Sequence, residues 1–328
     1  MKKICYLVVL TAMAVFGSAC NKTPAQQAEQ SQSAVATEEN NTETEEVKTE
    51  LPPVLAVCVK GLPLFAPFNE GDIINGGRDL KQTPEKYTKL ILDDAVYDVT
   101  YQGEKNKELK NDESTINQYY YKNNDAMKGQ LFDYADPKAI VNHLKTHGDM
   151  TAEGEVIPQE YADGILVSAD YLKGRTVMKV RATTTEAPGE PQFPADIVAK
   201  VEKILGQKVD QSRIAYLFGK DECQFGVMRT KPNDKYGVAA WVLADGKDVC
   251  VWTDTCEVVK EENRIYWSNI DPDEYMEPIV KAVVKGENGY EIYAIHMNTD
   301  EMAHYYLMRQ KGNKMQQTSM GSFYQQYE

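Results

Sequence analysis

Two histidines, His143 and His147, are spaced as a helical metal site requires. Residues four apart lie on one face of a helix, where two imidazoles can hold a zinc ion if further ligands approach. A metalloprotease helix would carry Glu directly after the first histidine, but this chain has Leu144 there. Asp149 and Glu153 are the nearby carboxylates. We therefore expect a solvated helix end here and no metal site.

Cys223 is the candidate nucleophile of the chain. The stretch Asp221–Gly226 reads DECQFG and resembles the "DCSGF" nucleophile motif of cysteine peptidases that cut cell-wall peptides. Such chemistry needs a thiolate beside a histidine, commonly at a helix N-terminus, and His296 or His304 would have to serve as the base. Because the residues after Cys223 have the pattern of a strand, we expect a structural cysteine and keep a cell-wall cysteine hydrolase as the enzyme alternative.

Four cysteines of the folded part raise the question of disulfides: Cys58, Cys223, Cys250 and Cys256. Four thiols allow three complete pairings, and sequence alone does not choose among them. Cys250 and Cys256 are the pair that we consider first, because Thr253-Asp254-Thr255 could turn the chain between them. The alternative is that all four are small buried apolar residues.

Aromatic and acidic clusters offer three further candidates. Tyr119, Tyr120 and Tyr121 could stack on a sugar or a peptide, because flat rings contact apolar faces while their hydroxyls bond polar groups. Trp241, Trp252 and Trp267 fall on successive predicted strands, and we expect them to form core. The acidic stretch Asp271–Glu274 lacks the ligand spacing and the glycine of an EF-hand loop, so we expect a solvated turn without calcium.

The N-terminus has the pattern of an export signal. Lys2 and Lys3 precede an apolar run, Tyr6–Phe16, that is too short to span a bilayer as a mature helix. The small residues before Cys20 resemble the lipobox of bacterial lipoproteins, as found in the Bacteroidota, with Gly17 where Leu is common. The resemblance implies a signal peptide at 1–19, cleavage before Cys20, acylation of its thiol, and a place in the cell envelope, at an outer membrane and facing the periplasm or the surface.

Residues 20–50 form the next segment, and they predict a disordered acidic tether behind the lipidated cysteine. This stretch contains no aromatic residue and is rich in Gln, Ser, Thr, Asn and Glu. It cannot bury enough apolar area to offset the entropy of ordering. A coil of this length would hold the folded part about 30 Å from the lipid.

The charge of the chain excludes some partners. It has 36 Lys and Arg against 50 Asp and Glu, a net charge of −14. Phosphate-rich partners would be repelled, so we expect no nucleic acid partner. The sequence contains no cofactor motif, and we expect neither a cofactor nor catalytic residues.

Residues 51–182 read as a first folded segment. They contain an apolar strand at 54–59, helical spacing within 84–94, a strand at 95–101, and a helix that begins at Asp136-Pro137. Gly164–Leu172 reads GILVSADYL and resembles the closing "GWVSxxYL" signature of bacterial SH3-like domains. That resemblance implies a small barrel that binds a peptide or a glycan, here with a long insertion at 102–158.

Residues 183–193 have linker composition, and 194–328 read as a C-terminal antiparallel β domain. One amphipathic helix at 197–205 ends at Gly206. It is followed by strands at 213–218, 223–229, 236–243, 249–253, 264–268, 279–285, 290–297 and 304–310. Asp245-Gly246 and Glu287-Asn288-Gly289 supply hairpin turns, so the order predicts a meander packed against the single helix.

The expected protein is mainly β, an SH3-like small barrel followed by an antiparallel β-meander with one amphipathic helix. We expect a non-enzymatic envelope lipoprotein that is held at the membrane through the lipid on Cys20 and binds a peptide, a glycan or a protein partner, such as peptidoglycan or an envelope protein. The binding surface is expected at Tyr119, Tyr120 and Tyr121. The alternatives are the hydrolase that uses Cys223 and a structural envelope scaffold without a small ligand.

Overall fold

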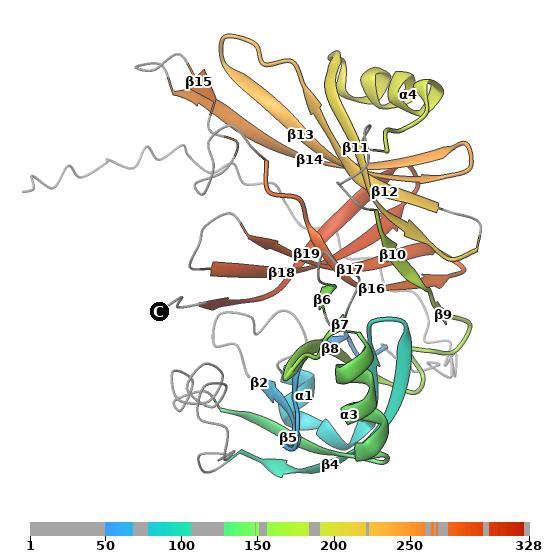
Figure 1. Ribbon diagram of the computed structural model, residues 1–328, viewed down its shortest axis with the longest axis vertical. Helices are drawn as coiled ribbons and strands as arrows, with labels where there is room; N and C mark the ends of the chain where they lie inside the picture. The colour runs from blue at the N-terminus through green and yellow to red at the C-terminus, as the bar shows by residue number, and fades with distance from the viewer. Residues whose placement is uncertain are drawn as a thin grey trace, which may run out of the picture. The chain divides into compact units, whose positions relative to one another are not determined.

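The computed structural model describes residues 50–67, 78–105, 128–147, 149–150, 156–183, 191–220, 223–259, 264–265, 267, 275–297 and 302–324. Residues 49–328 form one compact unit. The described part is mostly β, with a closed barrel and a large curled sheet (Figure 1). Within these ranges, no helix has the length and apolar character needed to cross a membrane. The fold class expected from the sequence, a small barrel followed by an antiparallel meander with one amphipathic helix, is confirmed.

Six strands close the N-terminal barrel in the order β1-β2-β5-β4-β3-β8. They are β1 (Val54–Val59), β2 (Leu64–Pro67), β3 (Tyr87–Leu92), β4 (Ala95–Glu104), β5 (Gly129–Tyr134) and β8 (Tyr161–Ser168). The short elements α1 (Arg78–Gln82), η2 (Pro84–Lys86), β6 (Asp149–Met150) and β7 (Val156–Ile157) join or flank them. The barrel interior is filled by apolar side chains, among them Leu64, Leu90, Leu92, Phe132 and Leu166.

The expected helix at Asp136-Pro137 is confirmed as α3 (Pro137–Thr146), because the Asp136 carboxylate accepts hydrogen bonds from the first backbone N–H groups. The helix suggested by the apolar spacing within 84–94 is wrong, because most of that stretch forms strand β3. Leu90 points into the barrel while Ile91 packs outside it, and both are fully buried. A strand buried on both faces has no polar alternation, and a short apolar run can then mimic helical spacing.

The C-terminal sheet consists of two antiparallel meanders. The first contains β10 (Val180–Ala182), β11 (Val209–Phe218), β12 (Cys223–Thr230), β13 (Tyr236–Asp245) and β14 (Asp248–Val259). The second contains β19 (Lys314–Tyr324), β18 (Met302–Lys311), β17 (Gly289–Met297), β16 (Ile279–Gly286) and β9 (Thr176–Val177). A single parallel pairing, Val251 with Lys314, joins β14 to β19, and β15 (Arg264–Ile265) lies off this path beside β14.

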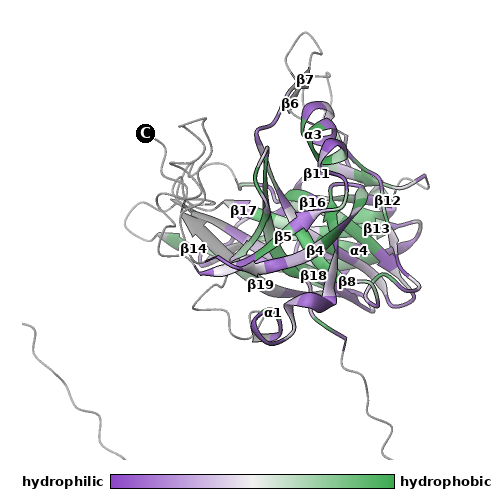
Figure 2. Ribbon diagram, turned by 90° about the horizontal axis from the view of Figure 1, so that it is seen from below, coloured by the Kyte–Doolittle hydropathy of each residue, from purple (hydrophilic) through white to green (hydrophobic). Residues whose placement is uncertain are grey.

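Three apolar layers hold these parts together, and Figure 1 shows the arrangement of the helix, the strands and the barrel between which they lie. Helix α4 (Ala195–Leu205) packs on the outer face of the first meander through Ile197 and Val201. The inner faces of the two meanders pack against each other around Trp241 and Phe225. The outer face of the second meander packs against the barrel. Figure 2 shows hydrophobic residues along the strands that lie inside this stack.

The contact between barrel and sheet is a buried core of its own. Apolar side chains from both sides meet there, namely Leu55, Ile91, Ile165, Val167 and Tyr171 with Ala282, Val284, Tyr293, Ile295, Tyr305, Leu307 and Met320. Strands β9 and β10 already belong to the C-terminal sheet, although the sequence assigns them to the first segment. Most of the expected linker, residues 184–190, lies outside the described residues.

Candidate functional site

The binding residues expected from the sequence, Tyr119, Tyr120 and Tyr121, lie outside the described residues. The same holds for Cys20 and for the acidic stretch Asp271–Glu274. The remaining candidates lie within the described ranges, so their surroundings bear on the chemistry that each could perform.

The two histidines tie helix α3 to the barrel. The hydroxyl of Tyr97 shares a hydrogen bond with Nδ1 of His143 at 2.9 Å, and Nε2 of His143 bonds the Asp93 carboxylate at 2.8 Å. The His147 ring stacks on His143 with the centroids 3.9 Å apart. His143 is buried, which corrects the expected solvated helix end for this residue. Both of its nitrogens are occupied by protein groups, and among the described residues no cluster of His, Cys, Asp and Glu is placed to hold a metal.

Cys223 has the surroundings of a structural cysteine. It opens strand β12, is buried, and shares a hydrogen bond with the Tyr290 hydroxyl. Burial raises the pKa of its thiol to about 12. His296, one of the two bases considered, directs Nε2 to the backbone oxygen of Met276 at 2.9 Å. A nucleophilic cysteine needs a lowered pKa and a histidine partner, so these features disfavour the hydrolase alternative.

The disulfide considered for Cys250 and Cys256 is not formed, and all four cysteines of the described part are free thiols. The residues expected to turn the chain, Thr253–Thr255, are part of the continuous strand β14. Six residues of strand separate the two thiols by about 20 Å, whereas a disulfide needs Cα atoms about 4.4–6.8 Å apart.

The tryptophans form core, as expected. Trp241 is fully buried, its ring centroid lies 4.8 Å from that of Trp252, and Trp267 packs against the same cluster. The indole N–H of Trp241 donates to the Tyr275 hydroxyl at 3.0 Å, so the buried polar atom has a partner.

Asp163 is a buried carboxyl group at the contact between barrel and sheet. The Tyr305 hydroxyl donates to it at 3.0 Å, and the Lys281 ammonium lies 3.9 Å away. Burial raises the pKa of Asp163 above its ordinary value, and Lys281 and Tyr305 oppose this shift only in part. Burial of this carboxyl therefore costs stability at neutral pH, and the cost shrinks as the pH falls below the folded-state pKa and is gone below the unfolded-state pKa.

Asp163→Asn should make the protein more stable than wild type at pH 7, because the amide is uncharged and its oxygen can still accept from Tyr305. The advantage should shrink when the pH is lowered towards the ordinary range of aspartate, since the wild-type carboxyl then binds its proton in the folded state. Chemical unfolding of both proteins at pH 7 and at about pH 4.5 measures this difference. An equal difference at the two pH values would contradict a raised pKa.

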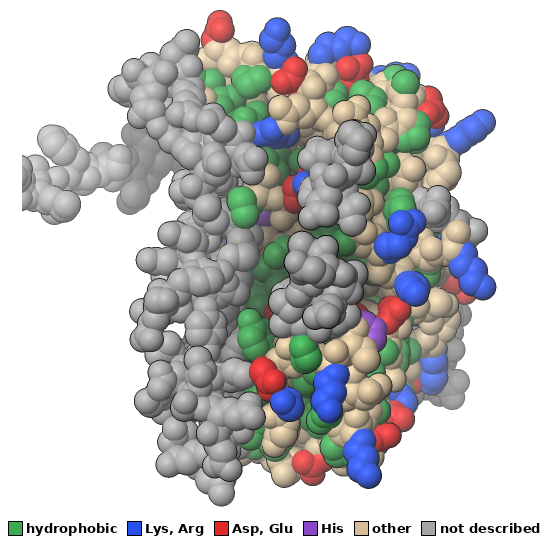
Figure 3. Space-filling model, viewed as in Figure 1, with side chains coloured by type: hydrophobic (Ala, Val, Ile, Leu, Met, Phe, Trp, Pro, Cys, Tyr) green, Lys and Arg blue, Asp and Glu red, His purple; other side chains and the backbone are tan. Residues whose placement is uncertain are grey.

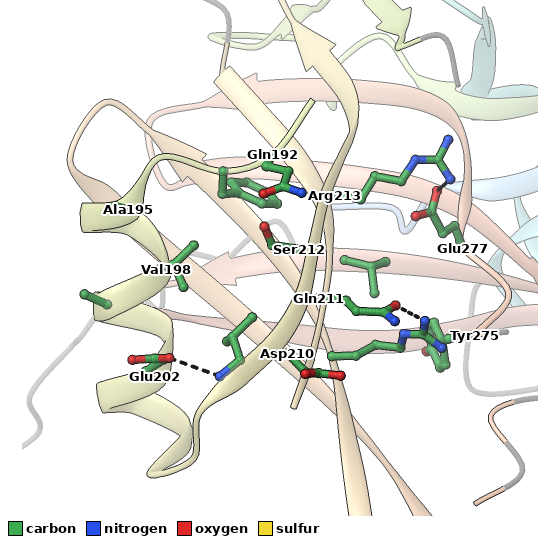
Figure 4. A pocket seen from close by; sticks show the side chains of 15 residues that line it. Gln192, Ala195, Val198, Glu202, Asp210, Gln211, Ser212, Arg213, Tyr275 and Glu277 are labelled. Carbon is green, nitrogen blue, oxygen red and sulfur yellow. Dashed lines mark hydrogen bonds and ion pairs between the residues drawn. The ribbon is translucent and has the colours of Figure 1, made fainter. Parts of the chain in front are cut away.

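A groove of about 650 Å³ lies beside helix α4 and runs along the edge of strand β11 (Figure 4). Its volume is in the range of ligand pockets. It has two walls and a floor, and its lining residues are Gln192, Phe193, Ala195, Val198, Ala199, Glu202, Val209, Asp210, Gln211, Ser212, Arg213, Val227, Arg229, Tyr275 and Glu277.

Helix α4 forms the first wall. Its apolar stripe is buried in the sheet, which turns the neighbouring face with Ala195, Val198 and Ala199 towards the groove. Gly206 ends the helix in the left-handed conformation, with φ at +67°. Below the helix, the Glu202 carboxylate accepts from the backbone N–H of Val209 at 3.1 Å and pairs with Lys208 at 2.6 Å. These contacts fix the distance between helix and strand.

The floor is an open strand edge. On that side of β11, Ile214 donates its N–H to the oxygen of Pro191 at 2.7 Å, and its carbonyl oxygen accepts from the Thr183 hydroxyl. Backbone groups alternate in direction along a strand, so Ser212 presents its N–H and C=O to the same edge. Strand β10 pairs only with Tyr216–Phe218. Strand β12 pairs with β11 at Ser212 from the other side, and on the edge away from β12 none of the described strands pairs with β11 at Ser212.

On the other side of β11, strand β12 approaches closely at Gly226. A Cβ atom at this position would lie 2.0 Å from the carbonyl oxygen of Arg213 and 2.9 Å from the backbone nitrogen of Ala215. Arg213 therefore directs its carbonyl oxygen towards β12, which agrees with the outward direction of the N–H at Ile214 and, by alternation, of the groups at Ser212. At Ala215 the register with β12 shifts, and its carbonyl oxygen accepts from the Thr183 N–H at 2.8 Å on the β10 edge.

Charged and aromatic side chains form the far wall. Nη1 of Arg213 contacts the Glu277 carboxylate at 2.9 Å (Figure 4). The Arg229 guanidinium lies 5.3 Å from the Trp267 ring centroid and donates to Gln211. On the face seen in Figure 3, basic and acidic side chains are interspersed over the described atoms. The groove thus combines an apolar shelf, a backbone edge and a polar wall.

Sequence reasoning missed this groove because its walls come from segments far apart in the chain. The predicted strand at 213–218 omitted the first four residues of β11, because Val209–Ser212 is mostly polar and lacks the apolar pattern of a strand. That polarity was the available signal, because strand edges commonly carry polar and charged residues. Comparison of the chain with models of known families, with curated proteins and with solved structures finds no match.

Proposed function

We propose that this chain is a non-enzymatic, lipid-anchored protein of a bacterial cell envelope that binds an extended peptide segment in the groove between α4 and β11. The observation that carries the peptide assignment is the backbone edge at Ser212, to which none of the described strands adds on the side away from β12. An added strand would exchange two backbone hydrogen bonds with that residue, which is how many domains take up extended peptides.

The chain itself uses this mode of pairing a few residues away. Strand β10 is short and pairs with Tyr216–Phe218 through backbone hydrogen bonds, and Thr183 and Pro191 continue along the same edge. A bound peptide would continue that edge at Ser212. An open edge of this kind matches the backbone of a peptide better than a glycan, because a glycan has no alternating N–H and C=O groups.

The two walls match the alternation of a strand. Side chains of an extended peptide point alternately to opposite sides, so one set would contact Ala195, Val198 and Ala199 on the helix. The other set would contact the polar wall at Arg213 and Glu277. A segment of about four residues, roughly 13 Å long, fits along Asp210–Arg213.

The envelope location rests on the sequence. The lipobox resemblance at Cys20 and the acidic, aromatic-free stretch that follows it support a lipid anchor and a tether. The partner would then be a peptide segment of an envelope protein or the peptide part of peptidoglycan. The net charge of −14 disfavours nucleic acid as a partner.

Ser212→Pro tests the backbone pairing. Proline removes the outward N–H of residue 212, and edge positions whose N–H faces away from the sheet tolerate proline. We expect binding to weaken about tenfold or more, because a hydrogen bond is lost and the added ring obstructs the edge. The measurement is capture of a display library of random decapeptides by the full chain in detergent, followed by titration of the enriched peptides.

Ser212→Ala is the matched control, because it removes the hydroxyl and keeps the backbone N–H. It should bind the enriched peptides as wild type does, and both variants should melt near the wild-type temperature. If no peptide is enriched, or if Ser212→Pro captures the same peptides equally well, the groove is not a peptide site. The protein would then be better described as an envelope scaffold without a small ligand.

A further inference from the structure

A second pocket, of about 730 Å³, lies between the segment that joins β8 to β9 and the turns of the hairpins β16–β17 and β18–β19. No residue of the described part lines both this pocket and the groove beside α4. The charged residues that line it are four basic and three acidic ones, namely Lys173, Arg175, Arg309 and Lys311 with Glu50, Glu287 and Glu291. The pocket is therefore locally positive in a chain whose net charge is −14.

Arg175 is held in one orientation in this pocket. Its aliphatic stem packs on Gly286, where a Cβ atom would lie 3.1 Å from the Cγ of Arg175. Its guanidinium carbon lies 4.4 Å from the Tyr171 ring centroid, and Nη1 donates to the Tyr171 backbone oxygen. Nη2 lies 3.6 Å from the Glu291 carboxylate. A guanidinium that is already fixed loses little side-chain entropy on binding, so these contacts prepare the fork of Nη1 and Nη2 for a planar partner.

The Glu50 carboxylate occupies this fork. Its Oε1 accepts from Nη1 of Arg175, and its Oε2 accepts from Nη2 at 2.9 Å. Two parallel bonds of this kind are the geometry in which arginine recognises a carboxylate. The fork is thus a built carboxylate site, and Glu50 shows which ligand atoms it takes.

Glu50 is a replaceable occupant. Its side chain is 42% exposed, whereas that of Arg175 is 20% exposed and has further contacts with Tyr171 and Glu291 that do not involve Glu50. An ion pair with so exposed a partner contributes little to stability. Without Glu50, four basic side chains would face two acidic ones. The volume of the pocket lies in the range of ligand sites and exceeds what one carboxylate needs.

We propose that this pocket is a carboxylate-binding site, with Arg175 as the receptor and Glu50 as a built-in competitor. The ligand replaces Glu50 in the fork with a carboxylate of its own. That carboxylate belongs either to a small dicarboxylate, whose second charge the remaining basic side chains attract, or to the C-terminus of a peptide. Binding would release residue 50, at which the predicted tether ends. The proposal does not rest on the peptide groove beside α4.

Calorimetric titration of the full chain in detergent with succinate tests the competition. Glu50→Gln should bind succinate about tenfold more tightly than wild type, the factor expected if Glu50 fills the fork about nine-tenths of the time. Glu287→Gln is the matched control, because it removes the same charge from the same pocket and leaves Glu50 in place. Its affinity should stay within about threefold of wild type, since an exposed charge acts weakly. An equal gain in the two variants, or no succinate or peptide binding in Glu50→Gln, overturns the proposal.

The double variant Arg175→Lys with Glu50→Gln tests the fork itself. Lysine keeps the charge and loses the two parallel donors, so succinate should bind about tenfold more weakly than to Glu50→Gln alone. Unchanged affinity in the folded double variant overturns the role of Arg175. If melting curves show that this variant has lost its fold, the comparison of Glu50→Gln with Glu287→Gln decides, because both retain Arg175.

Acetylated tetra-alanine, as the free acid and as the amide, identifies the source of the carboxylate in Glu50→Gln. Tighter binding of the peptide acid than of succinate assigns the site to a peptide C-terminus, and the reverse order assigns it to a small dicarboxylate. The amide should bind at least about tenfold more weakly than the acid, because it offers the fork no charged oxygens. Equal binding of acid and amide would show that the fork does not read a carboxylate and overturns the proposal.

Discussion

Replacing Cys20 with serine should move the protein from the membrane fraction to the soluble fraction. The proposal places the anchor on the Cys20 thiol alone, and serine has no thiol for the lipid to modify. Each buried methylene of a lipid chain contributes about 0.8 kcal/mol to membrane binding, so loss of the acyl chains removes many kcal/mol. We therefore expect nearly complete release. Fractionation of cells followed by a carbonate wash measures it.

Cys5→Ser is the matched control for this experiment. Cys5 lies in the apolar run expected to be removed with the signal peptide, so its replacement should leave the protein in the membrane fraction. Mass spectrometry of the N-terminal peptide should find lipid on Cys20 in wild type and in Cys5→Ser. Retention of Cys20→Ser in the carbonate-washed membranes would show that the lipoprotein assignment is wrong.

The strands of the C-terminal half were predictable because most of them are local hairpins. Asp245-Gly246 turns the chain between β13 and β14, and Gly289, with φ at +102°, opens β17. These glycines give short-range signals that need no knowledge of the fold. The pairing of β14 with β19 had no such signal, because the two strands lie more than fifty residues apart and share a single register pair.

The site was less predictable than the fold. The groove requires a helix, a strand edge and the segment around Tyr275, and only the tertiary structure brings them together. Nothing in the local sequence distinguishes Arg213 from any other arginine in a strand. The prediction of a disulfide between Cys250 and Cys256 was wrong for a related reason. Three polar residues can form a turn, or they can continue a long strand, as they do in β14.

The sequence predicts that the chain divides into two separable segments, and this stays a prediction. The contact between barrel and sheet determines what a cut between the segments should do. Strand β10 pairs with β11 although it precedes the expected linker. A protease cut within 183–191 would therefore leave two fragments that share this pairing and the apolar contact around Ile91 and Tyr293. We expect the cut fragments to remain together on size-exclusion chromatography in native buffer and to separate in denaturant.

Ile91→Ala should lower the free energy of unfolding by about 2–4 kcal/mol. Ile91 is fully buried, and its side chain lies on the outer face of the barrel, among the residues that contact the sheet. The truncation removes apolar contacts and leaves a cavity that a close-packed contact cannot fill by relaxing. Urea unfolding, followed by tryptophan fluorescence and by circular dichroism, measures the loss.

Two neighbouring truncations bracket this result. Leu90→Ala removes a fully buried side chain from the barrel interior and should cost a similar amount, whereas Val96, 42% exposed, should cost only a few tenths of a kcal/mol when changed to alanine. If Ile91→Ala behaves like Val96→Ala, the barrel does not pack on the sheet in solution. A cost near that of Leu90→Ala means that the contact is as closely packed as the barrel interior, so that barrel and sheet stabilise each other.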